Sequence, residues 1–381
     1  MSNTLTTIAP VLYSAAKEVA AESVGFLNAI NMNFDNKGVA KGDTVRVPVA
    51  PVRTISAFTP AAVSTAGTDV TSSAVAVSIA DSNKVSWHLD GEQIRSLENG
   101  GNYQDWLKQM TLQGMRALRN DAEAKAWAEA RKNSTRATGA PATDPFASTV
   151  GNLTAARQIL LDNGSPMSDL QLVIDSAAGT SLRNLGLVQN AYQAGSADQL
   201  ITGQFQPMFG FKIRESAQIV STTAGTASGA TTSNAGYAVG TTTITLASAG
   251  TNTLLAGDYV TFAGDSNIYC LTSGSADVSA GGTITLAAPG LKIAMSAATK
   301  AITVKAASKQ NIAFERNAIV GVVRPPLIPV NATIDQMEVT DSNGMTYLML
   351  DIQQYGMRSF ELHLAYGFKA VNPEFISTIL A

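Results

Sequence analysis

The stretch from Asn102 to Lys132 constrains the fold most, because it reads as one uninterrupted helix of unusual length. Its apolar residues recur at steps of three and four, the period of a helix with one buried stripe. No proline interrupts it, and at about 1.5 Å per residue it would reach roughly 45 Å. The expected stripe comprises Tyr103, Trp106, Leu107, Met110, Gly114, Ala117, Leu118 and Ala122.

The ends of this stretch also suit a helix. Asn102 is placed to cap the first turn, and Arg131 with Lys132 would lie near the negative end of the helix dipole. The simplest interpretation is a long core helix. We expect its buried contacts to be made by Trp106, Leu107, Met110 and Leu118.

The composition is poor in charge. Charged residues make up 14% of the 381 residues, well below the ~25% that is usual for soluble domains. A surface with few charges has less like-charge repulsion to resist self-association. Such a composition suits a subunit of a large assembly, and it equally suits an extracellular β-rich protein.

Several classes of protein are disfavoured by simple counts. The net charge of −3 leaves no basic excess to drive tight nucleic-acid binding. A single cysteine, Cys270, excludes both an intramolecular disulfide framework and a cysteine-built zinc site. The N-terminus lacks the basic and apolar regions of a secretory signal, and no apolar run of about 18 residues could span a bilayer. We therefore expect a cytoplasmic protein without membrane contact.

The first ninety residues predict an arm and a projecting hairpin. Residues 1–30 contain an amphipathic helix that begins near Pro10, and it either docks on its own domain or grips a neighbour. Asp43–Val49 and Ala74–Leu89 both alternate polar and apolar residues, as half-buried strands do. The weakly patterned segment 54–71 joins them, so the pair should form an extended hairpin.

After the long helix, the pattern is that of an α+β protein. Asn152–Asn163 predicts a helix with Asn152 as its cap, and Leu170–Asp175 and Phe209–Ile219 predict strands. From Ser221 to about Ser308 the composition becomes Thr-, Ser- and Gly-rich and β-like, which predicts a small inserted barrel or sandwich. The phrases TTITLASAG at 242–250 and GTITLAAPG at 282–290 are either an internal repeat or independent examples of a favourable strand sequence.

The C-terminal part returns to the mixed pattern from Asn311. The run Phe360–Phe368 predicts a strand, and a turn is expected at Tyr355-Gly356. We expect the C-terminal strands to pair with elements that precede the insertion.

No catalytic, cofactor-binding or metal-binding motif is present. The two histidines, His88 and His363, lie in predicted strands and not beside a nucleophile on a sharp turn. No zinc-protease motif, phosphate-binding loop or dinucleotide fingerprint occurs. The sequence therefore does not predict an enzyme.

The order of these features resembles one known family. The carrying residues are AVAVSIADSNKVSWHLDGEQIRSLENGGNYQDWLKQMTLQGMRALRNDAEAKAWAEA at 74–130, LLAGDYVTFAG at 254–264 and LAYGFKAVNPEFI at 364–376. Together they resemble the major capsid protein of tailed bacteriophages, which has the Hong Kong 97-type fold. The nearest likeness is to coat proteins of short-tailed Salmonella-type phages, which carry an inserted β domain.

The resemblance implies a domain plan. Residues 1–40 would be an N-terminal arm, 41–90 an extended hairpin loop, 91–221 the spine helix with the peripheral and axial α+β body, 222–308 the inserted β domain, and 309–381 the return to the axial and peripheral domains. Leu12, Tyr13, Arg53 and Phe58 would be candidates for contacts between subunits.

The resemblance also implies a function. The chain would be a structural protein that forms hexamers and pentamers of an icosahedral shell around double-stranded DNA, touching the DNA weakly and without sequence preference. A separate scaffolding protein and a portal would be its partners, the host cytoplasm its place of assembly, and the virion its final location. Some relatives crosslink subunits through a lysine on the extended loop. No lysine lies between Arg53 and Lys84, so we expect a shell without such crosslinks.

Two rival interpretations remain at this stage. A secreted or surface β-rich adhesin or S-layer-like protein is favoured by the Thr- and Ser-rich strands, and the missing signal sequence and the charged spine helix count against it. An enzyme of unrecognised type is the other.

Overall fold

The computed structural model describes residues 8–20, 25–34, 39–49, 55, 57, 60, 73–190, 201–328, 334–341 and 343–381. The helices are α1 (Ile8–Ala20), α2 (Phe26–Ala29), α3 (Gly91–Asn99), α4 (Tyr103–Lys132), α5 (Gly151–Asp162), α6 (Ser176–Asn184) and α7 (Gly186–Gln189). The strands are β1 (Asn31–Phe34), β2 (Thr44–Val49), β3 (Ser73–Ser78), β4 (Asp81–Asp90), β5 (Arg136–Gly139), β6 (Leu170–Ile174), β7 (Phe211–Glu215), β8 (Thr243–Leu246), β9 (Tyr259–Phe262), β10 (Ile268–Ser273), β11 (Gly282–Leu286), β12 (Ile302–Val304), β13 (Gln310–Glu315), β14 (Ile319–Arg324), β15 (Ile334–Thr340), β16 (Thr346–Gln354), β17 (Met357–Ala370) and β18 (Ile376–Leu380).

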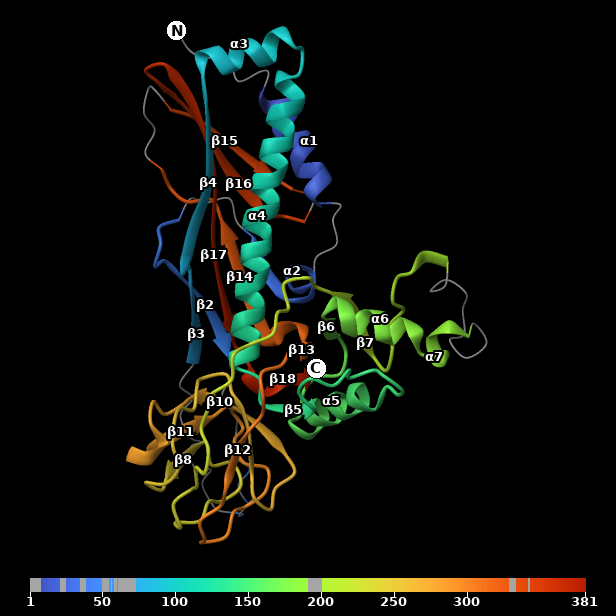
Figure 1. Cartoon of the computed structure of the whole chain (residues 1–381), viewed down its shortest axis with the longest axis vertical. Helices are drawn as coiled ribbons and strands as arrows, with labels where there is room; N and C mark the ends of the chain where they lie inside the picture. The colour runs from blue at the N-terminus through green and yellow to red at the C-terminus, as the bar shows by residue number, and fades with distance from the viewer. Residues whose placement is uncertain are drawn as a thin grey trace.

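The molecule is elongated, and α4 runs along most of its upper body (Figure 1). The strands β4 and β14–β17 lie beside this helix, and a β-rich unit that contains β8–β12 forms the lower end. A lobe built from α5, α6, α7, β6 and β7 projects to one side. The arrangement is α+β, as the sequence predicts.

The long helix is confirmed as α4, with 30 residues. Asn102 precedes it but makes no side-chain capping bond, so the predicted cap is wrong. Ala117, predicted on the buried stripe, is exposed. The reason is that 117 sits on the opposite side of the helix from 115 and 122, which face the sheet. The buried apolar positions are Leu107, Leu112, Met115, Leu118, Ala122, Ala126, Trp127 and Ala130.

The sheet beneath α4, the spine sheet, has six strands in the order β1-β14-β17-β16-β15, with β4 also paired to β17. Residues 357–366 of β17 pair with β4, and its other side pairs first with β16 and then with β14. Trp87 and Leu362 come from neighbouring strands and lie next to Gly114 of α4. A methyl group at Gly114 would lie 3.4 Å from Trp87 and 3.5 Å from Leu362, which is ordinary van der Waals contact, so a small side chain fits between this helix and the sheet.

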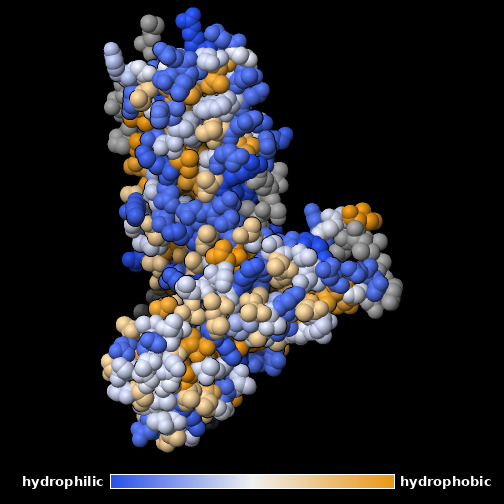
Figure 2. Space-filling view, viewed as in Figure 1, coloured by the Kyte–Doolittle hydropathy of each residue, from blue (hydrophilic) through white to orange (hydrophobic). Residues whose placement is uncertain are grey.

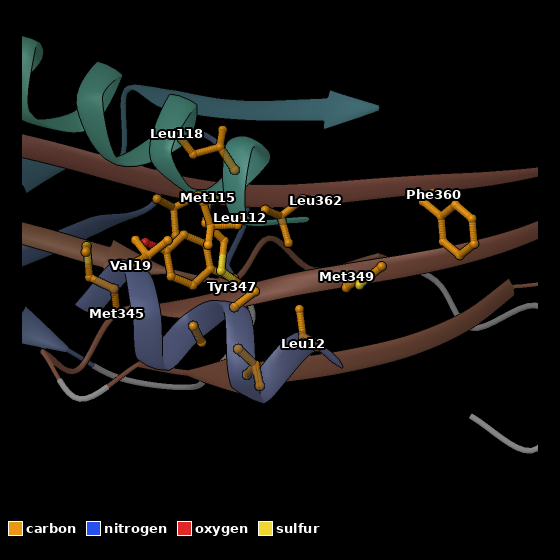
Figure 3. Packing of buried hydrophobic residues seen from close by; sticks show 14 of the residues in the cluster. Leu12, Val19, Leu112, Met115, Leu118, Met345, Tyr347, Met349, Phe360 and Leu362 are labelled. Carbon is orange, nitrogen blue, oxygen red and sulfur yellow. The ribbon is translucent and has the colours of Figure 1, made fainter. Parts of the chain in front are cut away.

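The helix α1 docks on its own chain, which resolves the alternative that the sequence leaves open. Leu12, Ala15, Ala16 and Val19 are buried against α4 and the strands β15 and β16. Figure 3 shows Leu12 and Val19 on α1 facing Leu112, Met115 and Tyr347. The side chain of Arg119 adds a polar anchor, because its Nη1 donates a hydrogen bond to the carbonyl oxygen of Val19.

The predicted hairpin exists only in part. β2 and β3 form an antiparallel two-stranded ribbon, in which Val45 lies opposite Val77. The run 74–89, predicted as one strand, is two strands, because the chain leaves the ribbon after β3 and β4 then pairs with β17. β4 therefore belongs to the spine sheet and not to the hairpin segment 41–90. Of the joining segment 54–71, only residues 55, 57 and 60 belong to the described part of the chain.

A second sheet connects the lobe with the lower unit. Its order is β12-β9-β10-β5-β18-β13-β6-β7, with β11 paired to β10 and β8 paired to β11. The predicted return of the C-terminal strands is confirmed, since β13 pairs with β6 and β17 with β4. The predicted cap Asn152 lies inside α5 instead, where its side chain bonds to Pro145 and Thr138.

The segment 222–308 closes into a small barrel. The two similar phrases are direct partners, with Ile244 of β8 opposite Ile284 of β11. Backbone bonds of residues 230–233 then bridge β8 and β12, from Ser233 N to Thr245 O at 2.8 Å and from Ile302 N to Ala230 O at 2.9 Å. The ring of β12, β9, β10, β11, β8 and 230–233 therefore has no open side. Its interior holds a separate apolar cluster that includes Val260, Phe262 and Leu271.

The barrel is joined to the body through backbone pairing as well as through the chain. Ile268 and Tyr269 of β10 pair with Ala137 and Arg136 of β5. A small apolar cluster that includes Tyr259, Cys270 and Leu380 fills this junction. The segment is thus continuous with the ten-stranded sheet, and its description as an inserted domain stays a prediction.

Candidate assembly surfaces

The described residues offer no catalytic constellation. Within the part of the chain that the structure describes, no group of three or more His, Cys, Asp or Glu side chains could hold a metal ion. His363 lies with Nε2 2.9 Å from Oε2 of Glu361, and burial lowers the pKa of this histidine. Among the helices that are described, none is long and apolar enough to cross a membrane. The other candidates for a functional site are surfaces that another protein could cover.

The β2–β3 ribbon carries a valine face. Val77 and Ile79 at its base are buried against Val320, Val322 and other residues on the side of the spine sheet that faces away from α4. Further along the ribbon, Val45, Val47, Val49 and Val75 are only half-buried. The opposite face of β2 is exposed and holds Thr44, Arg46 and Pro48. The ribbon thus presents a row of incompletely covered valines, which is typical of a surface that another protein covers.

The base of the ribbon is fixed by backbone hydrogen bonds. Ile79 N donates to Asp43 O and Gly42 N donates to Ile79 O, both at 2.9 Å. The carboxylate of Asp43 accepts a further bond from Ala40 N at 2.9 Å. These bonds hold the start of the ribbon in one direction relative to the sheet.

Buried polar groups on α4 tie three parts of the chain together. Glu123 accepts a hydrogen bond from Gly25 N at 3.0 Å and another from the hydroxyl of Ser216. Glu123 is only 3% exposed, and its two hydrogen bonds join α4 to the segment before α2 and to the end of β7. A methyl group at Gly25 would come within 2.8 Å of Ser216 and Val173, so only glycine fits this junction.

A second polar group joins α4 to the sheet edge. The hydroxyl of Tyr366 donates to Asp121, and Asn83 Nδ2 donates to the same carboxylate at 2.7 Å. Burial, and then the bond to Asp121, raise the pKa of Tyr366, so the hydroxyl stays protonated as a donor. Both this group and Glu123 brace α4, which makes the spine a rigid support for surfaces elsewhere on the subunit.

The β16–β17 hairpin ends in an exposed tip. Tyr355 is fully exposed and Gly356 has a φ of 78°, a value that favours glycine in the turn predicted at this site. Just inside the tip, Arg358 binds Asp351 through Nε at 2.9 Å and also through Nη2. The guanidinium of Arg358 lies 5.1 Å from the ring centre of Phe360. The tip is therefore a stiff projection that carries one exposed aromatic ring.

Of the four residues predicted to contact other subunits, the two that the structure describes differ in their exposure. Leu12 is fully buried inside its own chain, so its assignment as a contact between subunits is wrong; it packs on α4 because α1 folds back. Tyr13, its neighbour, is 58% exposed and remains a candidate. Arg53 and Phe58 lie outside the described residues.

The predicted spine contacts are placed on the helix as follows. Leu107 and Leu118 are buried, whereas Trp106 and Met110 are partly buried at the margin of the same cluster. Arg119 and Glu123 were missed as structural residues. A signal was available, because both positions continue the apolar stripe by a step of four from Met115, and a charge on such a stripe indicates a buried polar contact.

Solved structures match this chain over nearly its full length. A structure of Mycobacterium phage Che8 matches with a TM-score of 0.51 and 15% identity, over 94% of this chain and 91% of that chain. A capsid structure of the cyanophage P-SCSP1u matches with a TM-score of 0.50 and 12% identity, over 94% of this chain and 89% of that chain. This is the fold of phage capsid proteins. The predicted Hong Kong 97-type fold is confirmed, and the nearer likeness to Salmonella-type coat proteins stays a prediction.

The solved structures match this chain in fold, whereas sequence comparison finds no relative. No family model and no curated protein matches the chain. Identities of 15% and 12% are low, yet the match spans nearly the full length of both proteins. The likeness therefore lies in the fold of the whole chain.

Proposed function

We propose that the chain is a major capsid subunit that assembles with copies of itself into an icosahedral shell around double-stranded DNA. The observation that carries the proposal is the likeness to a cyanophage capsid structure over 94% of the chain. The half-covered valine face of the ribbon supports it, since such a face is suited to burial by a second subunit. The low fraction of charged residues also agrees with a self-assembling subunit.

Under this proposal, the subunits form hexamers and pentamers, and many modest contacts add up across the shell. A scaffolding protein and a portal take part in assembly, which occurs in the cytoplasm of the bacterial host, and the virion is the final location. Contact with DNA is weak and non-specific, because the chain has a net charge of −3. The role is structural and not enzymatic. The adhesin alternative has no support among the structures that match.

Electron microscopy of the purified full-length chain, with and without a co-expressed scaffold, tests the proposal. We expect closed shells. The variant Val47→Asp should remain a folded subunit but fail to form shells, because it places a charge on the half-buried valine face. Arg46→Gln is the matched control, since Arg46 lies next to Val47 on the exposed face. Wild-type protein that stays monomeric under all conditions would refute the proposal.

A further inference from the structure

A strand of the lobe that has no partner strand on its outer side among the described residues borders a cavity of about 390 Å³ that is rich in positive charge. The strand is β7, at the end of the ten-stranded sheet, and the segment 203–207 lies across from it. The lining includes Arg183, Lys212, Arg214 and the single carboxylate of Glu215. The cavity therefore contains more cations than its own lining neutralises.

Two of the three cations have partners. Arg183 binds Glu215 through two bonds of 2.7 and 2.6 Å, and its guanidinium lies 4.3 Å from the ring centre of Phe205. Lys212 Nζ lies 2.9 Å from Oδ1 of Asp169. The hydrogen bond from Lys212 is the main reason why the pKa of Asp169 lies below its usual value. Both carboxylates at this site are thus already used.

Arg214 is left without a partner. Among the described residues it makes no hydrogen bond or ion pair, and its Nε is buried with nothing to donate to. The carboxylate of Asp169 attracts Arg214 electrostatically, but it is already held by Lys212 and lies 3.8 Å from Arg316. Burial, and then the like charge of Arg316, lower the pKa of Arg214. A half-buried arginine without a partner lowers the stability of the fold unless an anion binds to its guanidinium.

Protection of the sheet edge does not account for this arrangement. Charged residues on an edge strand discourage edge-to-edge pairing, and exposed Lys212 is suited to that task. Such a charge works best in full contact with water. Arg214 is instead half-buried, and its side chain lies on the same face of the sheet as Val173 and Ile312, which belong to an apolar cluster.

We propose that Arg214 and its cavity bind a carboxylate side chain of a second copy of this chain. This inference rests on the proposed function as a self-assembling subunit. Arginine offers two parallel N–H donors that match a carboxylate, and the pair is stronger than neutral hydrogen bonds. Exposed carboxylates are available on a chain that has 29 acidic residues.

The surroundings favour a protein partner over nucleic acid. Leu187 is 39% exposed, Ile201 78% and Phe209 44%, and Figure 2 shows apolar residues at the outer end of this lobe. Interfaces between proteins are enriched in aromatic residues and arginine, whereas interfaces with DNA are more polar and more positive.

The chemistry also determines the symmetry of the contact. A cationic cavity cannot pair with its own copy, so it must meet a different, acidic surface of the neighbour. Such head-to-tail contacts close into rings when the rotation permits. The cavity on β7 would therefore hold neighbours within one ring of subunits.

The test compares full-length wild type, Arg214→Gln, Arg214→Lys and the control Arg157→Gln. Arg157 is exposed on α5 in the same lobe and does not line the cavity. Assembly is followed by sedimentation velocity over a range of protein concentrations, and the melting temperature of unassembled subunits is measured separately. We expect Arg214→Gln to raise the concentration for half-assembly at least about tenfold. Arg214→Lys should fall between it and the wild type, and Arg157→Gln should match the wild type.

The melting temperature supplies the independent readout. Removal of an unpaired charge should leave the melting temperature of the unassembled Arg214→Gln subunit unchanged or higher. A lower value would show that the partner lies in the same chain, and would overturn the inference. The inference would also be overturned if Arg214→Gln assembled at the same protein concentration as the wild type. If that variant assembled normally but lost binding to mixed-sequence duplex DNA, the ligand of Arg214 would be nucleic acid instead. In these cases the proposed function stands, whereas a wild type that never assembles overturns both.

Discussion

Replacement of Leu118 by glutamate should unfold the spine and not merely block assembly. Leu118 is 3% exposed and lies in the cluster that joins α4 to α1 and the spine sheet. Loss of the leucine side chain costs about 2–3 kcal/mol of apolar burial. A buried carboxyl group without a partner adds about 2–7 kcal/mol. The sum approaches the ~5–15 kcal/mol by which folded domains are stable.

A graded series makes this prediction quantitative. Leu118→Ala should cost about 3 kcal/mol, within the range found for buried leucines. Ala117→Glu is the matched control, since Ala117 is adjacent but exposed, and should change the free energy of unfolding by less than about 0.5 kcal/mol. Urea unfolding followed by tryptophan fluorescence is a suitable assay. The three tryptophans, Trp87, Trp106 and Trp127, all lie on α4 or on β4 beneath it.

The outcome that refutes the reasoning is specific. Soluble Leu118→Glu subunits with the urea midpoint of the wild type would show that the contact between α4 and the sheet does not govern stability. Equal destabilisation by Ala117→Glu would show that a charge anywhere on this part of the helix is harmful. Either result would remove the distinction between the two faces of α4.

Three further predictions concern other parts of the chain. Burial raises the pKa of the Cys270 thiol to about 12, so this cysteine, the only one in the sequence, should stay protonated at pH 8. The folded protein should therefore not react with a disulfide reagent, whereas the protein unfolded in urea should react with one equivalent. Asp351→Asn should lower the free energy of unfolding in urea by about 2 kcal/mol. This is less than the ~3–5 kcal/mol for breaking a fully buried ion pair, because the side chain of Arg358 is 27% exposed. A decrease below about 0.5 kcal/mol would contradict the prediction. Denaturing gels of particles should show monomers alone, since no lysine lies between Arg53 and Lys84, and a ladder of covalent oligomers would disprove it.

The sequence is informative where one face of an element is consistently buried. The α4 helix and the strand β6 were predicted within one residue of their observed ends, because their apolar patterns persist over their full length. The turn at Tyr355-Gly356 was predictable for a different reason: glycine readily adopts the positive φ of this turn, which other residues rarely adopt.

The division between β3 and β4 could not be predicted, and the reason is geometrical. Val77 and Ile79 pack on the side of the sheet away from α4, whereas Trp87 and Leu89 pack on the side that α4 covers. All four are odd-numbered, so the alternation continues unchanged across the break. A period of two records which residues share a face, but it does not record which face that is.

The candidate surfaces were less accessible to sequence reasoning. The valine face was visible as alternation in 43–49, yet its partial exposure depends on how far the ribbon extends from the sheet. The lone Arg214 was invisible, since only the folded arrangement shows that Glu215 and Asp169 are taken by other cations. Whether an arginine has a partner depends on which residues lie beside it in the folded chain, and the sequence alone does not give this.

The placement of β17 has a mechanical consequence. The strand is 14 residues long and is paired on both sides, with β4 along one side and with β16 and then β14 along the other. Tension along such a strand is shared by all of its backbone hydrogen bonds at once, as in shear, whereas peeling an edge strand breaks them in succession. The six-stranded sheet should therefore resist stretching along β17 more strongly than it resists peeling at its edges.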